Sequence, residues 1–354
     1  MNSKQFRIGV IGTGSISDAH LKAYSNNNDA ILVATCDLNE ERASNAAQKY
    51  NASLVYTDYH ELLANPDIDA VSICTWNNSH ARIAIDALHA GKHVLVEKPL
   101  CRTVEEALEV QAAVQATGKL LQVGFVRRYD PNAQLLREFI DNGEFGELYY
   151  GKASYIRRLG NPGGWFSDIT RSGGGPLIDL GVHVIDLIWY LMGKPKVTTV
   201  SANTYKKLGN RSNVRNLSSY KAADYDAAIN TVEDLANALI RFENGASLLV
   251  DVSFTLHAKS DEGAIKLYGE KGGFEVDPAL TIVSEKHNTI LNIAPQTDHA
   301  SFQFDAAFQG EINHFIDCIR EGKQPLSPVE DGVEIMKILC AIYESAAKGE
   351  EIKL

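Results

Sequence analysis

The feature that constrains the fold of this chain most is a glycine-rich turn that follows directly on a short apolar run. Residues 7–11 lead into Gly12-Thr13-Gly14-Ser15-Ile16-Ser17, and a helical pattern begins just after it. Gly12 permits a tight turn, Gly14 lets the backbone approach a ligand, and a helix beginning here offers N–H groups to an anion. This is the G-x-G-x-x-G arrangement with Ser17 in the last position, which serves only the packing of helix on strand. Alone it is a weak signal, because similar turns also occur in purely structural settings.

Short apolar runs alternate with helical stretches as far as residue 125. Helical stretches at 79–90 and 104–117 end at Gly91 and Gly118, as helix C-termini commonly do. The apolar runs are 7–11, 31–36, 70–74, 93–96 and 120–125. This alternation predicts an α/β fold with a doubly wound parallel sheet, and it places the glycine turn where such sheets bind dinucleotides.

The second apolar run ends in Asp37, at the position where the dinucleotide fingerprint has an acid that accepts hydrogen bonds from the adenosine ribose. An acid here repels a 2′-phosphate, so we expect NAD as cofactor in preference to NADP. Asp37 also fits a second interpretation, as a turn or N-cap residue before a helix at 39–50.

Two charged residues and a proline follow the fourth apolar run, as Glu97-Lys98-Pro99. This position corresponds to the carboxyl end of a buried strand, where open α/β sheets bind their ligands. Because Pro99 restricts the backbone of the residue before it, we expect Lys98 to be held facing the nicotinamide. The alternative is a solvated Glu-Lys turn without a function.

The most informative segment runs from Gly173-Gly174-Gly175-Pro176 to Gly193, and it predicts one buried helix. Asp179, His183, Asp186 and Tyr190 fall on one stripe of this helix, and nearly every other position is apolar. Polar groups on a buried helix must be paired or must face a cleft. Asp179 lies one turn from His183 and can orient it as a general base. The alternative is a hydrogen-bonded core histidine with capping aspartates.

The remaining chain predicts a second domain, because 354 residues exceed one ordinary core. A helix at 131–142 precedes alternating strands from 197 to about 293, which suit an antiparallel or mixed sheet, and the last 45 residues are helical. Asn244-Gly245 between two strands predicts a hairpin. The polar stretch 206–225 predicts a long loop. We place the domain boundary between residues 125 and 126.

Composition excludes several classes of protein. The net charge of −11 disfavours nucleic acid as a partner, and no apolar run reaches the length of a membrane helix. The five cysteines lie far apart, so neither a disulfide framework nor a metal site is expected. Residues 1–5 lead straight into the first strand without a secretory signal, and we expect a cytoplasmic protein.

Taken together, the motifs resemble those of the Gfo/Idh/MocA oxidoreductases. The resemblance spans nearly the whole chain, and Ser17 is the only clear departure from it. Residues 124–130 further resemble the inositol dehydrogenases of that family. The motifs that carry it are the glycine turn, Asp37, Thr75-Trp76-Asn77-Asn78-Ser79-His80, Glu97-Lys98-Pro99 and Asp179-Leu180-Gly181-Val182-His183.

The resemblance implies an N-terminal Rossmann domain and a C-terminal α+β domain with a large, open, mostly antiparallel sheet that often mediates dimers or tetramers. It also implies a catalytic set of Lys98, Asp179 and His183. Cofactor contacts are implied for the glycine turn, Asp37, Thr75, Asn77, His80, Glu97 and Lys98. Arg127, Tyr155, Arg158 and Trp165 flank the predicted cleft and are expected to contact substrate, together with Asp179 and His183.

These features predict an enzyme that oxidises a secondary alcohol of a cyclitol or sugar with NAD. In this scheme His183 takes the hydroxyl proton, Asp179 holds the imidazole and Lys98 steadies the oxygen. Two alternatives stay open. One is a family member that retains its NAD for redox-assisted hydrolysis or epimerisation, and the other is a non-catalytic sugar or NAD sensor. The intact catalytic set argues against the sensor.

Overall fold

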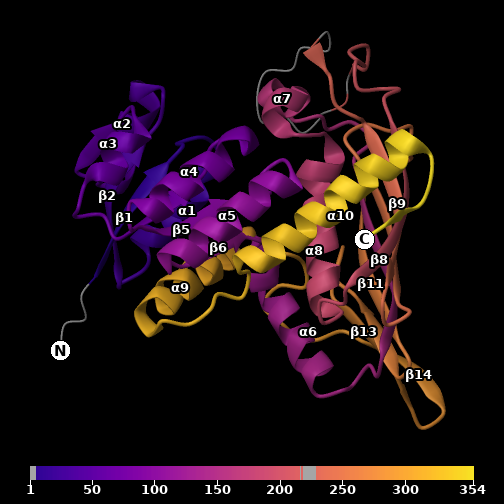
Figure 1. Ribbon diagram of the computed structural model, residues 1–354. Coiled ribbons are helices and arrows are strands. Elements are labelled where there is room, and N and C mark those ends of the chain that lie inside the picture. The colour runs from indigo at the N-terminus through magenta and orange to yellow at the C-terminus, as the bar shows by residue number, and fades with distance from the viewer. Residues whose placement is uncertain (1–4, 216, 218–228) are drawn as a thin grey trace. The chain divides into compact units, whose positions relative to one another are not determined.

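The computed structural model describes residues 5–215, 217 and 229–354, and the chain divides into two compact units (Figure 1). Unit 1 comprises Met1–Tyr129 and Phe304–Met336, and unit 2 comprises Asp130–Gln303 and Lys337–Leu354. The chain first passes from unit 1 to unit 2 after Tyr129, four residues beyond the expected boundary. The return of residues 304–336 to unit 1 was not expected.

Unit 1 contains a parallel sheet whose described strands lie in the order β3-β2-β1-β4-β5-β6. This confirms the doubly wound fold. The short strand β3 escaped prediction because three partly exposed residues carry no readable periodicity. The strands are β1 (Phe6–Ile11), β2 (Ala30–Cys36), β3 (Leu54–Tyr56), β4 (Ala70–Ile73), β5 (His93–Glu97) and β6 (Leu121–Gly124).

The helices of unit 1 differ in how they begin. Asn39, Asp58 and Thr103 cap α2, α3 and α5 through side-chain hydrogen bonds. In contrast, α1 and α4 begin after Ile16 and Trp76 without a side-chain cap. These two helices follow β1 and β4, the neighbours at which the strand order reverses. The bounds are α1 (Ser17–Ser25), α2 (Glu40–Tyr50), α3 (Tyr59–Ala64), α4 (Asn77–His89), α5 (Val104–Thr117), the 3₁₀ turn η1 (Val126–Tyr129) and α9 (Phe304–Glu321).

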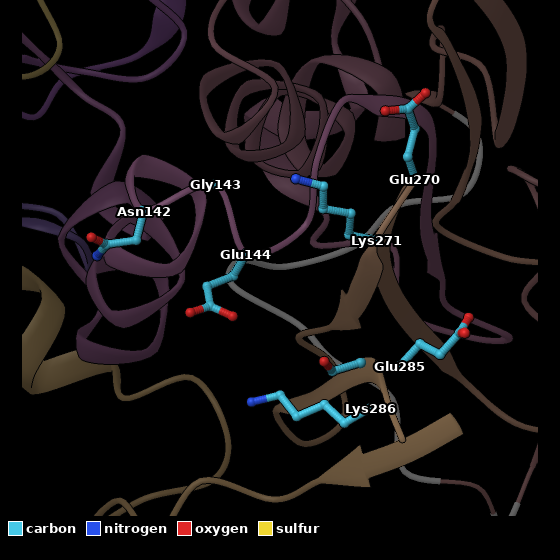
Figure 2. A pocket seen from close by; sticks show the side chains of 8 residues that line it. Asn142, Gly143, Glu144, Glu270, Lys271, Glu285 and Lys286 are labelled. Atoms are coloured by element: carbon cyan, nitrogen blue, oxygen red, sulfur yellow. The ribbon is translucent and has the colours of Figure 1, made fainter. Parts of the chain in front are cut away.

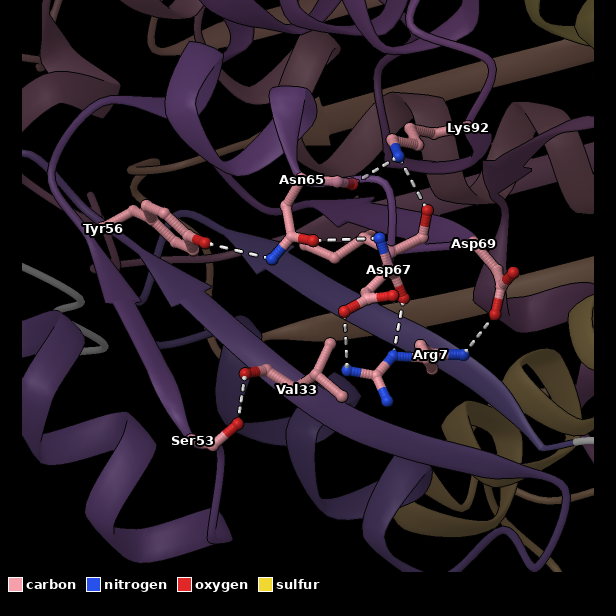
Figure 3. A network of polar contacts seen from close by, with 9 residues as sticks. Arg7, Val33, Ser53, Tyr56, Asn65, Asp67, Asp69 and Lys92 are labelled. Atoms are coloured by element: carbon pink, nitrogen blue, oxygen red, sulfur yellow. Dashed lines mark hydrogen bonds and ion pairs between the residues drawn. The ribbon is translucent and has the colours of Figure 1, made fainter.

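A polar network ties together the amino ends of the strands of this sheet (Figure 3). The Arg7 Nε atom donates to the Asp67 carbonyl at 2.7 Å, and the Arg7 amide donates to the Asp69 carboxylate at 2.9 Å. The Lys92 ammonium donates to the carbonyls of Asn65 and Ile68. These contacts fix the amino edge, and the opposite carboxyl edge carries the candidate site.

Helix α9 belongs to the core of unit 1 although it begins 180 positions after the end of β6. Ile312, Phe315 and Ile316 are fully buried in the same apolar cluster as Ile8 and Leu21. Burying three large apolar side chains stabilises the unit by several kcal/mol, at about 1.5–3 kcal/mol for each. The first 125 residues therefore do not contain their whole core.

Unit 2 is built on a large sheet with the described strand order β14-β13-β12-β11-β7-β10-β9-β8-β15. Its pairings are antiparallel except that of β7 with β10, which confirms the expected open, mostly antiparallel sheet. The strands are β7 (Leu148–Ile156), β8 (Val197–Tyr205), β9 (Leu235–Phe242), β10 (Ser247–Ser253), β11 (Glu262–Gly269), β12 (Gly272–Glu275), β13 (Thr281–Lys286), β14 (Thr289–Ile293) and β15 (Ile352–Lys353).

The predicted hairpin is confirmed between β9 and β10. Gly245 has a φ of +84°, and the Phe242 amide donates to the Ala246 carbonyl at 2.9 Å. A glycine suits this turn because a side chain resists positive φ. In α10 (Val329–Lys348) the chain passes from unit 1 back to unit 2, between Met336 and Lys337. The other elements of this unit are α6 (Pro131–Asp141), η2 (Gly164–Ser167), α7 (Ile169–Ser172), η3 (Leu177–Gly181) and α8 (Val182–Leu191).

One described stretch, Ile169–Leu191, is long and apolar enough to cross a membrane by composition alone. However, 89% of its most apolar window is buried inside the protein. That placement is the one expected of a core helix that packs against a sheet.

Candidate active site

The glycine turn sits at the carboxyl end of β1, and its two glycines serve different purposes. Gly12 has a φ of +87°, and a Cβ atom there would lie 2.6 Å from the Cys74 carbonyl oxygen. The fold itself therefore requires this glycine. Gly14 is exposed, and a Cβ atom there would meet nothing within 4 Å. The open space above Gly14 is what a closely approaching pyrophosphate requires.

The uncapped start of α1 completes an anion-binding surface at this turn. Its first N–H groups receive no side-chain cap, and Ser17, the departure from the glycine pattern, turns its hydroxyl to the Gly14 carbonyl at 2.6 Å. An uncapped helix N-terminus beside a glycine turn suits the pyrophosphate of a dinucleotide. The residues present therefore fit NAD, with Ser15 and Ile16 on the same turn.

Asp37 lies at the end of β2, where its carboxylate holds the turns on either side of it. Its Oδ2 atom accepts hydrogen bonds from the Thr13 amide at 2.8 Å and the Thr13 hydroxyl at 3.1 Å, and its Oδ1 atom accepts one from the Asn39 amide at 2.9 Å. These contacts hold the glycine turn against β2. The carboxylate stays partly exposed, so a ribose contact remains sterically open.

The end of β5 holds Lys98 through a buried neighbour. The Glu97 carboxylate accepts a hydrogen bond from the Lys98 amide at 3.1 Å, and its other oxygen lies 2.8 Å from His20 Nε2. Burial alone would raise the pKa of Glu97, but the hydrogen bond and charge of His20 hold that pKa below its usual value. The Lys98–Pro99 peptide is cis, and Lys98 itself is partly exposed.

His20 is a residue that the sequence motifs did not single out. It lies on α1, and its Nδ1 atom is 3.3 Å from the hydroxyl of Ser72, which in turn is 2.8 Å from that of Tyr24. His20, Glu97 and Glu311 offer ligand atoms within 4.8 Å of one another, all of them buried. The contact that identifies His20 spans 77 positions of sequence, so no local pattern reveals it.

The His80 side chain points inward and links the segment at Thr75 to the segment at Pro99. Its ring is fully buried, with Nδ1 2.8 Å from the Pro99 carbonyl and Nε2 3.0 Å from the Thr75 carbonyl. Burial lowers the pKa of His80. Both ring nitrogens thus lie against backbone carbonyls of the protein, and a contact of His80 with the cofactor stays a prediction. Asn77 begins α4 and is buried.

The helix that follows the three glycines begins with a π-turn, and only two of its residues reach the surface. Residues 174–192 are buried except Asp179 and His183, which are both partly exposed. Asp186 is fully buried and Tyr190 nearly so, so the predicted stripe of four reduces to an accessible pair. The π-turn, Leu177–Gly181, contains Asp179, and such turns are frequent at functional sites.

The four residues expected to contact substrate lie in different settings. Tyr155 shares the face of β7 with Gly151, where an added Cβ atom would lie 3.0 Å from the Ile188 side chain of α8. Trp165 stacks on Phe166 with ring centroids 3.9 Å apart, and both are partly exposed. The Arg158 guanidinium donates to the Lys259 carbonyl at 2.8 Å. Arg127 is partly exposed on η1 of unit 1.

Lys98 belongs to unit 1, whereas Asp179 and His183 belong to unit 2. The meeting of these three side chains stays a prediction. Of the expected loop at 206–225, residues 216 and 218–225 lie outside the described residues.

A shallow groove of about 560 Å³ lies elsewhere on unit 2, and Figure 2 shows the side chains around it. Both acids and lysines line it, and none of the residues expected to bind cofactor or substrate does. It is lined by Asn142, Gly143, Glu144, Glu270, Lys271, Ser284, Glu285 and Lys286. We assign it no part in the chemistry.

The fold and the glycine-turn geometry define a dinucleotide-dependent oxidoreductase with a second α/β domain. The chain belongs to the Gfo/Idh/MocA oxidoreductase family: residues 6–125 match its NAD-binding Rossmann fold and residues 137–354 its C-terminal alpha/beta domain. It is thus an NAD-binding enzyme of that family.

Characterised relatives act on sugars and inositols. The chain is 32% identical to D-glucoside 3-dehydrogenase of Escherichia coli (strain K12), covering 100% of this chain and 99% of the relative. It is 30% identical to scyllo-inositol 2-dehydrogenase (NAD(+)) of Bacillus subtilis (strain 168), covering 99% and 96%. A structure of levoglucosan dehydrogenase in complex with NADH superimposes with a TM-score of 0.86 at 25% identity, covering 99% of both chains.

Proposed function

We propose that this enzyme oxidises a secondary alcohol of a sugar or cyclitol to a ketone, with His183 as general base and Asp179 and Lys98 as its partners. The observation that carries the proposal is the exposure pattern of the helix: in residues 174–192 only Asp179 and His183 reach the surface. A carboxylate one turn from an imidazole, on a helix that is otherwise buried, suits proton abstraction near neutral pH.

In the proposed reaction His183 takes the proton of the substrate hydroxyl, and Asp179 holds the ring and balances its positive charge. Lys98 donates a hydrogen bond to the same oxygen and stabilises the charge that develops on it. The hydride leaves the carbinol carbon with the electron pair of its C–H bond, and NAD, when bound, supplies the acceptor for it. Tyr155, Arg158, Trp165 and Arg127 would hold the other hydroxyl groups of the substrate.

The experiment is a substrate screen. Purified enzyme with NAD is supplied with inositols, free sugars, glucosides and levoglucosan, and NADH is followed by absorbance. The proposal expects NADH formation with at least one polyol, and a loss of turnover of about 10²-fold or more in Lys98→Met while NAD affinity is kept. A converted product without net NADH would instead favour redox-assisted epimerisation or hydrolysis. Absence of any turnover, with sugar binding retained, would favour a sensor.

We also propose that copies of the chain associate through the face of the large sheet that lies opposite α8. Three apolar side chains lie near one another on that face in neighbouring strands: Tyr150 stacks on Tyr268 with ring centroids 5.6 Å apart, and Leu249 is 37% exposed. An exposed apolar sheet face commonly marks an interface. Light scattering should show a dimer or tetramer, and Leu249→Lys should dissociate it; a monomeric wild type would refute this.

We propose a cytoplasmic location because the cysteines form no disulfide bonds. All five are free thiols, four of them buried, which suits a reducing compartment. Fractionation of cells that express the tagged protein would test this.

A further inference from the structure

A short segment before β9 carries two adjacent acids that are both buried. Glu233 and Asp234 are each only 3% exposed, and their carboxylates contact different parts of unit 2. Burying two carboxylates is costly unless each accepts several hydrogen bonds. Their partners therefore indicate what the fold gains from them.

The Glu233 carboxylate is bound to the start of the helix that carries Asp179 and His183. It accepts hydrogen bonds from the amides of Gly175 at 2.9 Å and Leu177 at 3.2 Å, and from the Tyr343 hydroxyl at 2.8 Å. The first amides of a helix have no partner within the helix. The Glu233 carboxylate supplies a hydrogen-bond acceptor from outside the helix, at the point where the π-turn begins.

The glycines that precede this helix are explained by the same contacts. A Cβ atom on Gly174 would lie 2.0 Å from the Tyr343 hydroxyl, and one on Gly175 would lie 2.3 Å from the Glu233 carbonyl oxygen. Any side chain at either position would push Glu233 and Tyr343 away from the helix. The repeated glycines thus allow the close approach that the carboxylate needs.

The neighbouring residues fix two further loops of the same unit. Asp234 accepts hydrogen bonds from the amides of Lys207, Leu208 and Gly209. The Thr231 amide donates to the Ser167 carbonyl, and its hydroxyl accepts from the Ile169 amide, on the segment that follows Trp165. Residues 231–234 therefore join the catalytic helix to loops on both sides of it.

We propose that Glu233 is a positioning residue for the reaction, one that fixes the π-turn and so the places of Asp179 and His183. This inference rests on the proposed function of those two residues. Asp179 lies two positions after Leu177, whose amide Glu233 holds, and His183 lies one turn further along. An acid–base pair must sit within a fraction of an ångström of its working geometry, so the anchor of its helix controls the rate.

The carboxylate has a chemical advantage over an amide at this position. Three donors, two amides and one hydroxyl, meet its two oxygens, and a carboxylate is an acceptor only. A glutamine would turn its NH₂ group toward one of these donors and lose that bond. Glu233→Gln therefore keeps the shape of the side chain and removes one contact from the helix start.

The test compares Glu233→Gln with Asp86→Asn, a partly buried carboxylate on α4 of unit 1 that likewise accepts a hydrogen bond from a tyrosine hydroxyl, that of Tyr59 at 2.8 Å. With a substrate found by the screen, Glu233→Gln should lower kcat about 10- to 100-fold, with KM changed less than about threefold. Its NADH affinity should stay at the wild-type value, because the nucleotide turn lies in unit 1. Asp86→Asn should leave kcat within about twofold of wild type.

Two further measurements separate an effect on position from a failure to fold. Tyr343→Phe keeps the carboxylate and removes one donor, and it should lower kcat by about fivefold. Hydrogen–deuterium exchange at the Gly175 and Leu177 amides should be about tenfold faster in Glu233→Gln and unchanged in Asp86→Asn. A wild-type kcat in folded Glu233→Gln would overturn the inference. If no polyol is turned over, the proposed function fails, and unchanged exchange at these amides would then overturn the anchor as well.

Discussion

The Nε2 atom of His20 lies 2.8 Å from the Oε1 atom of Glu97, and neither side chain is more than 7% exposed. His20 stands on the helix that follows the glycine turn, and Glu97 immediately precedes Lys98. The pair thus joins the element that suits the cofactor pyrophosphate to the residue expected to act on the substrate. No sequence motif in this chain points to that pairing.

Removing the imidazole should leave a buried carboxylate without its hydrogen-bond partner. We expect His20→Leu to lower the free energy of unfolding by about 3 kcal/mol, and to lower kcat through displacement of Lys98. Urea unfolding of the NAD-free protein measures the first effect. His89→Leu, at the exposed end of α4, is the matched control and should change stability by less than about 0.5 kcal/mol. Equal stabilities for both variants would contradict the role given to the pair.

The two glycines of the nucleotide turn should respond differently to alanine. Gly14→Ala meets open space, so its unfolding free energy should stay near the wild-type value while its NAD affinity falls about tenfold or more. Gly12→Ala combines a positive φ with a backbone clash and should lose about 2 kcal/mol or more of stability. Fluorescence titration with NADH measures the cofactor affinity, and urea unfolding measures the stability. Unaltered NAD binding by Gly14→Ala would place the pyrophosphate elsewhere.

Asp37 should decide between NAD and NADP. Replacing its charge by a hydroxyl in Asp37→Ser removes both the ribose acceptor and the repulsion of a 2′-phosphate. We expect the ratio of kcat/KM for NAD to that for NADP to fall at least about tenfold, since hydrogen bonds to a charged group contribute about 1.5–3 kcal/mol. A wild-type enzyme that prefers NADP at matched concentrations would refute this assignment before any variant is made.

His93 should make the stability of unit 1 depend on pH. Its Nδ1 atom accepts a hydrogen bond from the Leu120 amide, and burial lowers the pKa of His93 from 6.5 to about 4. The unfolded chain therefore binds more protons between these values, so this stability is present above about pH 6.5 and is lost as the pH falls toward 4. Because the ring is partly exposed, we expect the stability lost through His93 to be about 1–2 kcal/mol.

The measurement is urea unfolding at pH 7.5 and pH 5 for wild type and His93→Asn, whose side-chain oxygen can replace the Nδ1 acceptor without titrating. The wild type should lose more stability on acidification than the variant. Equal losses in the two proteins would show that other groups cause the pH dependence.

Much of unit 1 could be predicted because its signals are local. The glycine turn, Asp37 and the strand that ends in Glu97 each lie within a few residues of the structure they specify. Periodicity predicted every strand of this unit except β3 to within a residue or two. The π-turn was not foreseen, because a helical period of 3.6 residues hides a single wider turn. The exposure pattern was not foreseen either, since Asp179 and His183 are accessible while Asp186 and Tyr190 are buried.

Contacts between distant residues could not be predicted in this way. His20 meets Glu97 across 77 positions, and Glu233 meets Gly175 across 58. In a single sequence an isolated histidine or glutamate looks the same whether it is buried or solvated. His80 illustrates the same limit, since its ring faces two backbone carbonyls of the protein.

The participation of α9 in the first apolar core has a practical consequence for dissecting the enzyme. A fragment that stops after β6 would expose Ile8 and Leu21, which Ile312, Phe315 and Ile316 cover in the intact chain. Such a fragment would aggregate or stay partly unfolded, whatever the quality of its nucleotide motif. A free-standing nucleotide-binding module would have to splice residues 304–336 onto the first 129 through a new linker.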